Sequence, residues 1–416
     1  MGQSEMHSLR WFGWLSVGLL AAGACATHAT EPPLPQSNAD PASAEPAPAP
    51  GSASSAAWDA GAACPDGAVA DGCAPGVAFA AADGGMLPSA PPRPPGTIPG
   101  GLARGSGDDA DRALLGGDQA LEQEDLEAAR RHYERARRLA PEDPAPAVGL
   151  VRVRLAKTGL PLSPAAAPDD RRLLELQREL SAILKRSSDY GPAYLEHGQI
   201  ALMLGQASDA LVSLERAAQL MPYDPDAHTA LGVALLATGQ RAAAAARLER
   251  AVALDPHSPD RLANWGAALL STGRVRDAIR AYEQAVALAP DDPRASGDLG
   301  TAYLAANDPY RALPHLERAV KLAPQRATFL SNLGHAYQVL GRYDQAIATC
   351  RRALVEDDQL VEAWVNLAIA YAKQRRYDDA DHALGRAHAL APDDPRVRAN
   401  QAELDALRRQ QQAPKR

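Results

Sequence analysis

From about residue 110 onward, apolar and polar positions follow the period of an amphipathic helix, and short breaks divide the pattern into pairs. The stretch NLGHAYQVLGRYDQAI, residues 332–347, shows one such pair. Its first half places four apolar side chains on one helical face, namely Leu333, Ala336, Tyr337 and Leu340. Gly341 breaks the pattern, and a second helix is predicted from Tyr343 to Val355. Each unit is therefore predicted to be a helix–turn–helix.

The unit is repeated, because equivalent residues recur at a spacing of 34. Prolines mark unit ends at Pro222, Pro256, Pro290 and Pro324, and Asp358 takes the place of the next one. One column of small residues contains Gly117, Gly198, Gly232, Gly266, Gly300, Gly334 and finally Ala368. Two alanine columns contain Ala129, Ala210, Ala244, Ala278, Ala312, Ala346 and Ala380, and Ala136, Ala217, Ala251, Ala285, Ala319, Ala353 and Ala387. Small side chains let the two helices of a pair approach closely. One pair cannot bury its apolar surface alone, so neighbouring units must stack on it.

These residues resemble the tetratricopeptide repeat. In the unit that starts at residue 327, the family signature falls on Leu330, Leu333, Gly334, Tyr337, Ala346, Cys350, Ala353 and Asp358. Cys350 replaces the usual aromatic residue and Asp358 replaces the proline. The preceding units keep the pattern, with Trp265, Gly266, Ala278, Tyr282, Ala285 and Pro290 in one of them. The resemblance implies an all-α, right-handed superhelical solenoid.

Eight units are predicted, and the second is irregular because its turn is enlarged. They span 110–143, the irregular 144–190, 191–224, 225–258, 259–292, 293–326, 327–360 and 361–394. In the irregular unit, helices are expected from Ala145 to Lys157 and from Arg171 to Arg186. Residues 395–416 are predicted to be a polar capping helix and tail, which the end of a repeat array needs.

The N-terminal quarter has a different character. Residues 11–24, WFGWLSVGLLAAGA, are apolar but too few to span a bilayer, so residues 1–24 suit a signal peptide. The sequence Ala22-Gly23-Ala24-Cys25 resembles a bacterial lipoprotein signal, which implies acylation at Cys25 and, with Ala26 after it, an outer-membrane address facing the periplasm. Ordinary cleavage to a secreted or periplasmic protein, or an uncleaved anchor, are the alternatives.

Residues 25–109 are rich in Pro, Ala, Gly and Ser and poor in aliphatic residues, so they are predicted to be a disordered tether. Flexible-chain scaling gives such a segment an end-to-end distance of roughly 50 Å. Cys64 and Cys73 enclose a turn-rich loop and could form a disulfide after export, or remain unpaired thiols. Cys350 is predicted to be a buried small apolar residue.

Composition and motifs argue against several classes of function. The net charge is −8 and no Lys/Arg-rich run occurs in the 416 residues, so nucleic acid is not an expected partner. The histidines and cysteines lack metal-ligand spacing, and no phosphate-binding loop or nucleophile elbow occurs. Charged residues alternate at helical spacing, as on solvated helix faces. We therefore expect no enzyme activity, metal, cofactor or small-molecule substrate.

What remains is a binding surface, which the family places in a concave groove lined by the first helix of each unit. The residue before Leu-Gly faces the ligand there, and this column ends with Asn264, Asp298, Asn332 and Asn366. Such a ladder resembles the one in glycosyltransferase repeat domains that hold extended peptides, and the alternative is that each Asn bonds locally. Leu202, Leu236, Leu270 and Leu304 could form an apolar strip, or pack against the adjacent unit. His335 and Gln338 are also expected to face the groove.

We thus expect a non-catalytic, lipid-anchored scaffold of the bacterial cell envelope, whose groove binds a segment of a protein partner during assembly of an envelope complex. Pilotin-type lipoproteins, which escort secretin subunits, share this layout. A soluble repeat adaptor, or a non-catalytic subunit of an envelope enzyme, are the alternative functions.

Overall fold

The computed structural model describes residue 98 and residues 100–412. These residues form 17 α-helices, and no β-strand occurs among them, so the all-α prediction is confirmed. The first helices of the units are α2 (Asp109–Glu122), α4 (Pro144–Ala156), α6 (Gly191–Met203), α8 (Pro225–Ala237), α10 (Pro259–Ser271), α12 (Pro293–Ala305), α14 (Ala327–Val339) and α16 (Val361–Lys373). The second helices are α3 (Leu126–Leu139), α5 (Arg171–Arg186), α7 (Ala207–Leu220), α9 (Arg241–Leu254), α11 (Val275–Leu288), α13 (Pro309–Leu322), α15 (Tyr343–Glu356) and α17 (Tyr377–Leu390). The final helix is α18 (Pro395–Gln412).

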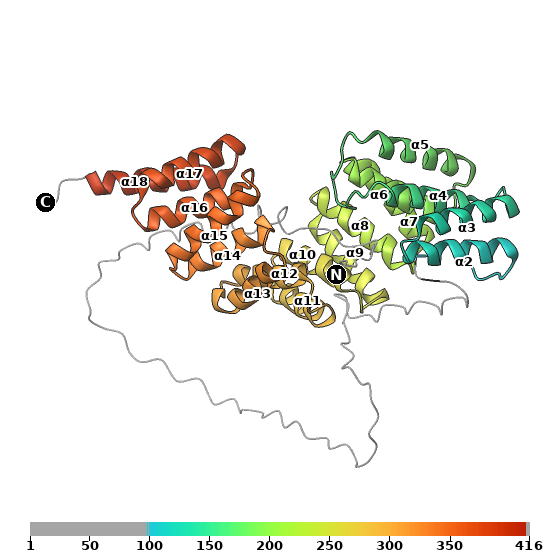
Figure 1. Cartoon of the computed structure of the whole chain (residues 1–416), viewed down its shortest axis with the longest axis horizontal. Coiled ribbons are helices and arrows are strands. Elements are labelled where there is room, and N and C mark those ends of the chain that lie inside the picture. The colour runs from blue at the N-terminus through green and yellow to red at the C-terminus, as the bar shows by residue number, and fades with distance from the viewer. Residues whose placement is uncertain (1–97, 99, 413–416) are drawn as a thin grey trace, which may run out of the picture. The chain divides into compact units, whose positions relative to one another are not determined.

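Each helix packs against the next one along the chain, and each pair stacks on its neighbours to give the predicted solenoid (Figure 1). Several first helices begin with the same local signal, an acceptor side chain followed by proline. Asp224, for example, accepts a hydrogen bond at 2.8 Å from the backbone N–H of Ala227, with Pro225 at the first helical position. This arrangement satisfies a free backbone donor and fixes φ for the helix start. The turns between units are thereby defined locally.

The small-residue columns explain the close packing inside each unit. Every member of both alanine columns is 0% exposed, at the contact between second and first helices. At Gly266, an added Cβ would lie 2.8 Å from the Tyr282 ring, closer than side-chain atoms normally approach. Cys350 is also 0% exposed, as predicted, and burial raises the pKa of its thiol to about 12.

The turn within each unit requires a left-handed residue. Gly205, Gly239, Gly273 and Gly341 hold this position with φ between 72° and 78°. In three other units the same position is occupied by Glu124, Asn307 and Arg375, with φ of 57–61°. Non-glycine residues are strained in this region, so these turns are the weaker ones.

The irregular second unit has its helices where they were predicted, and the enlarged turn between them packs on the following unit. The backbone N–H groups of Ala165 and Ala167 donate to the carbonyl oxygens of Leu202 and Met203 at 2.8 and 3.0 Å. The loop therefore covers the end of α6.

One boundary needs correction, because the predicted tether was extended too far toward the C terminus. Residues 100–107, here called the strap, lie against the array, and Leu102 and Ala103 are 3% and 7% exposed. Composition alone marked the strap as linker, since its partners are far away in the sequence. The signal peptide, Cys25, Cys64 and Cys73 lie outside the described residues. Within the described residues, none of the helices is long and apolar enough to cross a membrane.

Candidate peptide-binding face

The first helices contact one another in succession from α2 to α16, and α16 contacts α18. They form a continuous layer of the solenoid, which we call the first-helix face. Polar side chains from successive units can align along this layer. It is therefore the place to look for a site that binds an extended chain.

The strap crosses the first-helix face and is held there through its backbone. Both Leu102 and Ala103 donate their backbone N–H to one carboxylate oxygen, Oδ2 of Asp118 on α2, at 2.7 and 2.9 Å. The other oxygen of Asp118 accepts from the hydroxyl of Tyr133 at 2.8 Å. Asp118 is 3% exposed, and burial raises its pKa although these hydrogen bonds act to lower it. The buried carboxylate of Asp118 thus binds the backbone of the strap.

Arg152 on α4 binds the other end of the strap. Its Nη1 donates to the carbonyl oxygen of Gly100 at 2.7 Å, while its Nε donates to Oε1 of Glu196 on α6 at 2.6 Å. The Arg152 and Glu196 side chains are 9% and 1% exposed. Burial, the largest single effect, would lower the pKa of Arg152, but the charges of Glu196, Tyr133 and Asp118, with the hydrogen bond to Glu196, together raise it. A buried ion pair that lost either partner would leave an uncompensated charge, so the pair is tightly constrained.

The strap also fits by shape and by charge. Gly100 has φ +66°, and a Cβ there would lie 2.8 Å from Oδ2 of Asp226 on α8. Arg104 forms a two-pronged contact with Asp143, at 2.7 and 3.1 Å, and its backbone N–H donates to Asp111 at 2.6 Å. Gly100 and Arg104 therefore each contact a different carboxylate of the array.

Sequence reasoning missed the residues that hold the strap, although the repeat register contained the signal. Asp118 and Arg152 are 34 apart and are each the ninth residue of their unit, the position that His335 holds in 327–360. The same column continues with Gln199, which is 6% exposed, and neither amide atom of Gln199 has a hydrogen-bond partner in the described residues. Comparing the whole column, rather than one unit, would have revealed a row of buried polar groups.

The predicted asparagine ladder lies on the first-helix face, and its amides bond to the preceding unit. Nδ2 of Asn332 donates to Oγ1 of Thr301 at 3.0 Å, and Nδ2 of Asn366 donates to Oγ of Ser331 at 3.2 Å. Asn264 is buried at 4% exposure. The amide nitrogens of Asn332 and Asn366 thus take part in packing between units, and binding of a peptide by the ladder stays a prediction.

Asp298, the acidic member of the ladder, is half-buried. Burial raises its pKa to about 8, and Asp292 adds to this, whereas the charges of Arg294 and Arg326 act to lower it. Asp226 shows a similar effect, with its pKa raised to about 7 mainly by burial despite an ion pair with Arg261. The shift favours the neutral carboxyl of Asp298 over its carboxylate, and a neutral carboxyl can donate a hydrogen bond.

The other predicted groove residues differ in accessibility. His335 and Gln338 are half-buried; burial lowers the pKa of His335, and Oε1 of Gln338 has no partner within the described part of the chain. In the leucine column, Leu202 and Leu270 are buried at 6% and 7% exposure. Leu236 and Leu304 are half-buried. The leucine column thus offers an interrupted apolar strip.

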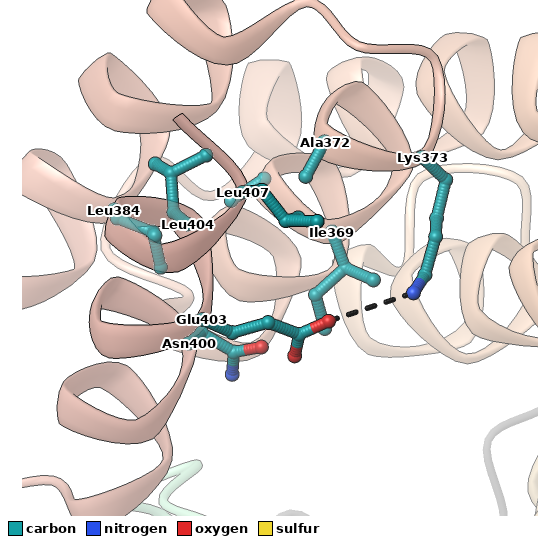
Figure 2. Close-up of a pocket in the computed structure, with 9 residues that line it drawn as sticks. Ile369, Ala372, Lys373, Leu384, Asn400, Glu403, Leu404 and Leu407 are labelled. Carbon is teal, nitrogen blue, oxygen red and sulfur yellow. Dashed lines mark ion pairs between the residues drawn. The ribbon is translucent and has the colours of Figure 1, made fainter. Parts of the chain in front are cut away.

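Figure 2 shows a small hollow at the C-terminal end, between α16, α17 and α18. Leu384, Leu404 and Leu407 line its apolar side, and an ion pair between Lys373 and Glu403, at 3.6 Å, borders it. Its volume of about 20 Å³ leaves room for little more than a water molecule. Among residues 98 and 100–412, no group of three His, Cys, Asp or Glu side chains could hold a metal ion.

Two tetratricopeptide-repeat family models match parts of the repeat array. One tetratricopeptide-repeat profile matches residues 263–327 and 298–361, and a second matches residues 201–268 and 340–404. No curated protein sequence matches the chain.

Among solved structures, the chain is similar to one in the crystal structure of the APC/C hetero-tetramer Cut9-Hcn1, with 17% identity over 71% of this chain and a TM-score of 0.55. This chain spans 56% of the length of that one, and the likeness is one of fold. PilF of Pseudomonas aeruginosa is 22% identical over 53% of this chain and 99% of its own, with a TM-score of 0.44. YrrB, described as having an unusual peptide-binding site, is 20% identical over 45% of this chain and 97% of its own, with a TM-score of 0.35.

Proposed function

Because tetratricopeptide-repeat family models match residues 201–404, we propose that the protein is a non-catalytic scaffold that binds a segment of a partner protein on its first-helix face. The observation that carries this proposal is the strap itself. Side chains of α2 and α4 hold a non-helical run of main chain, which includes a turn at Gly100, through three backbone hydrogen bonds, at Gly100, Leu102 and Ala103. A face that binds its own polypeptide in this way has the chemistry to bind another.

Unused polar atoms on the same face support the proposal. Both amide atoms of Gln199, Oε2 of Glu196 and Oε1 of Gln338 are buried and have no partner within the described residues. A buried polar group without a hydrogen bond is costly, and a ligand that supplies the missing bonds would recover that free energy on binding. Amide side chains offer a donor and an acceptor together, which matches a peptide backbone.

We further propose that the scaffold works in the bacterial cell envelope, anchored through an acylated Cys25. The motif at residues 22–25 and the Pro-, Ala-, Gly- and Ser-rich segment after it support this placement. The segment would let the array reach a partner away from the membrane surface. Assembly of an envelope complex is the task that suits such a tethered, non-catalytic binding module.

Site-specific photo-crosslinking tests the binding function. A photoreactive amino acid at His335, on the first-helix face, should capture a defined partner protein in cells. The matched control is Val355 on α15, which is 83% exposed and belongs to a second helix. Equal products at both positions, or none at residue 335, would contradict the proposal.

The envelope placement has a separate test. Labelled palmitate should be incorporated into the wild-type chain and be absent from Cys25→Ser. Export of the wild-type chain without any label would rule out the lipid anchor and leave the binding function untouched.

A further inference from the structure

We propose that the strap is a displaceable internal ligand, and that the partner segment is a Gly-Gly-Leu-Ala-Arg-like peptide that replaces it on α2, α4 and α8 in the same turned conformation. This inference rests on the proposed function and gives the partner a chemistry. The strap and the two residues before it, residues 98–107, have the sequence IPGGLARGSG.

Each part of the strap defines one feature of the replacing peptide. A glycine is needed beside Asp226, because φ is +66° there and a Cβ would lie 2.8 Å from Oδ2. A leucine is needed where Leu102 joins the buried core at 3% exposure. An arginine two residues later would take the place of Arg104 on Asp143.

The strap is suited to displacement because it contributes only two apolar side chains, Leu102 and Ala103, to the buried core. It belongs to no helix. Its backbone groups at Gly100, Leu102, Ala103 and Arg104 bond to side chains of the array, and the N–H of Gly101 donates to the carbonyl oxygen of Ile98 at 3.1 Å. Segments held by few buried apolar contacts open more easily than core helices. Because the strap precedes α2 in the chain, its release would not require any helix of the array to unfold.

Polar groups next to the strap remain available to a longer peptide. Arg152 spends Nε on Glu196 and Nη1 on Gly100, whereas Oε2 of Glu196 and the amide of Gln199 are unpaired in the described residues. Gln199 and Glu196 are 6% and 1% exposed, so solvent does not readily satisfy them. A partner segment that extends beyond the strap would supply these bonds, which favours replacement of the strap over its return.

Competition between strap and peptide gives the test. A fluorescent peptide with the sequence IPGGLARGSG is titrated into the full chain, as wild type and as Leu102→Glu. The strap in cis competes at a high effective concentration, so the variant should bind the peptide at least about tenfold more tightly than wild type. Gly100→Val disrupts the other end of the strap and should have the same effect. A peptide with glutamate in place of leucine should not bind either variant.

Several outcomes would overturn the inference. Absence of peptide binding to both strap variants, with their helical circular dichroism intact, would show that the strap is a fixed structural element. Exchange of straps between two copies, seen as a strap-dependent dimer, would make a second copy the occupant instead. If crosslinking at residue 335 persisted while the peptide failed to bind, the proposed function would stand and this inference would fall.

Discussion

Gly334 on α14 lies directly opposite Cys350 on α15, so close that a Cβ at residue 334 would overlap the Sγ of Cys350. Gly334→Ala should therefore destabilise the array, by about 1–3 kcal/mol, as overpacking of a tight core does. Urea unfolding measures the change. The double variant Gly334→Ala/Cys350→Ala should recover part of the loss, because the alanine at residue 350 makes room.

Gly385→Ala is the control for this comparison, because an added Cβ at Gly385 in α17 meets no atom within 4 Å. That change should stabilise the protein by about 0.5–1 kcal/mol through helix propensity alone. Equal effects of alanine at residues 334 and 385 would contradict the packing argument.

Arg375 takes the left-handed turn position that glycine holds in most units, with φ 61°. Arg375→Gly should stabilise the last unit by about 1 kcal/mol, because glycine adopts this conformation without steric cost. The side chain is exposed, so little contact is lost. Thermal unfolding of Arg375→Gly and Arg375→Ala separates the two effects, since alanine keeps the strain. A gain from both variants would show that the arginine side chain, rather than φ, is the unfavourable element.

The fold was largely predictable because its determinants repeat. Gly266 and Tyr282, like Gly334 and Cys350, are 16 residues apart, so one unit contains both the small residue and what packs on it. The strap was not predictable from composition, because Leu102 is buried by an array that does not resemble it in sequence. The left-handed backbone conformation of Arg375 was equally hard to predict from that residue alone, since arginine does not favour it.

Asp298 predicts a pH-dependent stability. Its pKa is raised from 3.8 to about 8 in the folded protein, so between these values the folded state binds more protons than the unfolded state. Stability attributable to this group is therefore greatest at low pH and falls as pH rises toward 8. Asp298→Asn should raise the melting temperature by several degrees at pH 8.5 and by less at pH 5. Asp393→Asn, at an exposed position, is the control. A gain independent of pH would contradict this origin.

Two sets of variants separate the contribution of the asparagine ladder to packing from its contribution to partner binding. The double variant Asn332→Ala/Asn366→Ala removes two side-chain amides from the first-helix face, and it should abolish capture of the crosslinked partner. Thr301→Val removes the acceptor for Asn332 but keeps the amide, so it should cost about 0.5–1.5 kcal/mol of stability and preserve capture. Unchanged capture by the double alanine variant would reduce the ladder to a packing device.

Tyr133 and Tyr282 occupy equivalent positions in two units, and both are 0% exposed. The hydroxyl of Tyr133 donates to Asp118 at 2.8 Å, whereas the hydroxyl of Tyr282 has no partner in the described residues. Loss of a buried hydrogen bond leaves the carboxylate under-satisfied, so Tyr133→Phe should cost about 1–3 kcal/mol. Tyr282→Phe removes an unsatisfied polar atom and should be neutral or stabilising.

Urea unfolding of the two phenylalanine variants measures this difference in sign. Tyr133→Phe should also increase amide hydrogen exchange at Leu102 and Ala103, because Asp118 accepts from both of those backbone groups and from Tyr133. Tyr282→Phe should leave exchange in the strap unchanged. Equal destabilisation by both variants would mean that the hydroxyl of Tyr133 contributes nothing specific, and that Asp118 holds the strap without its help.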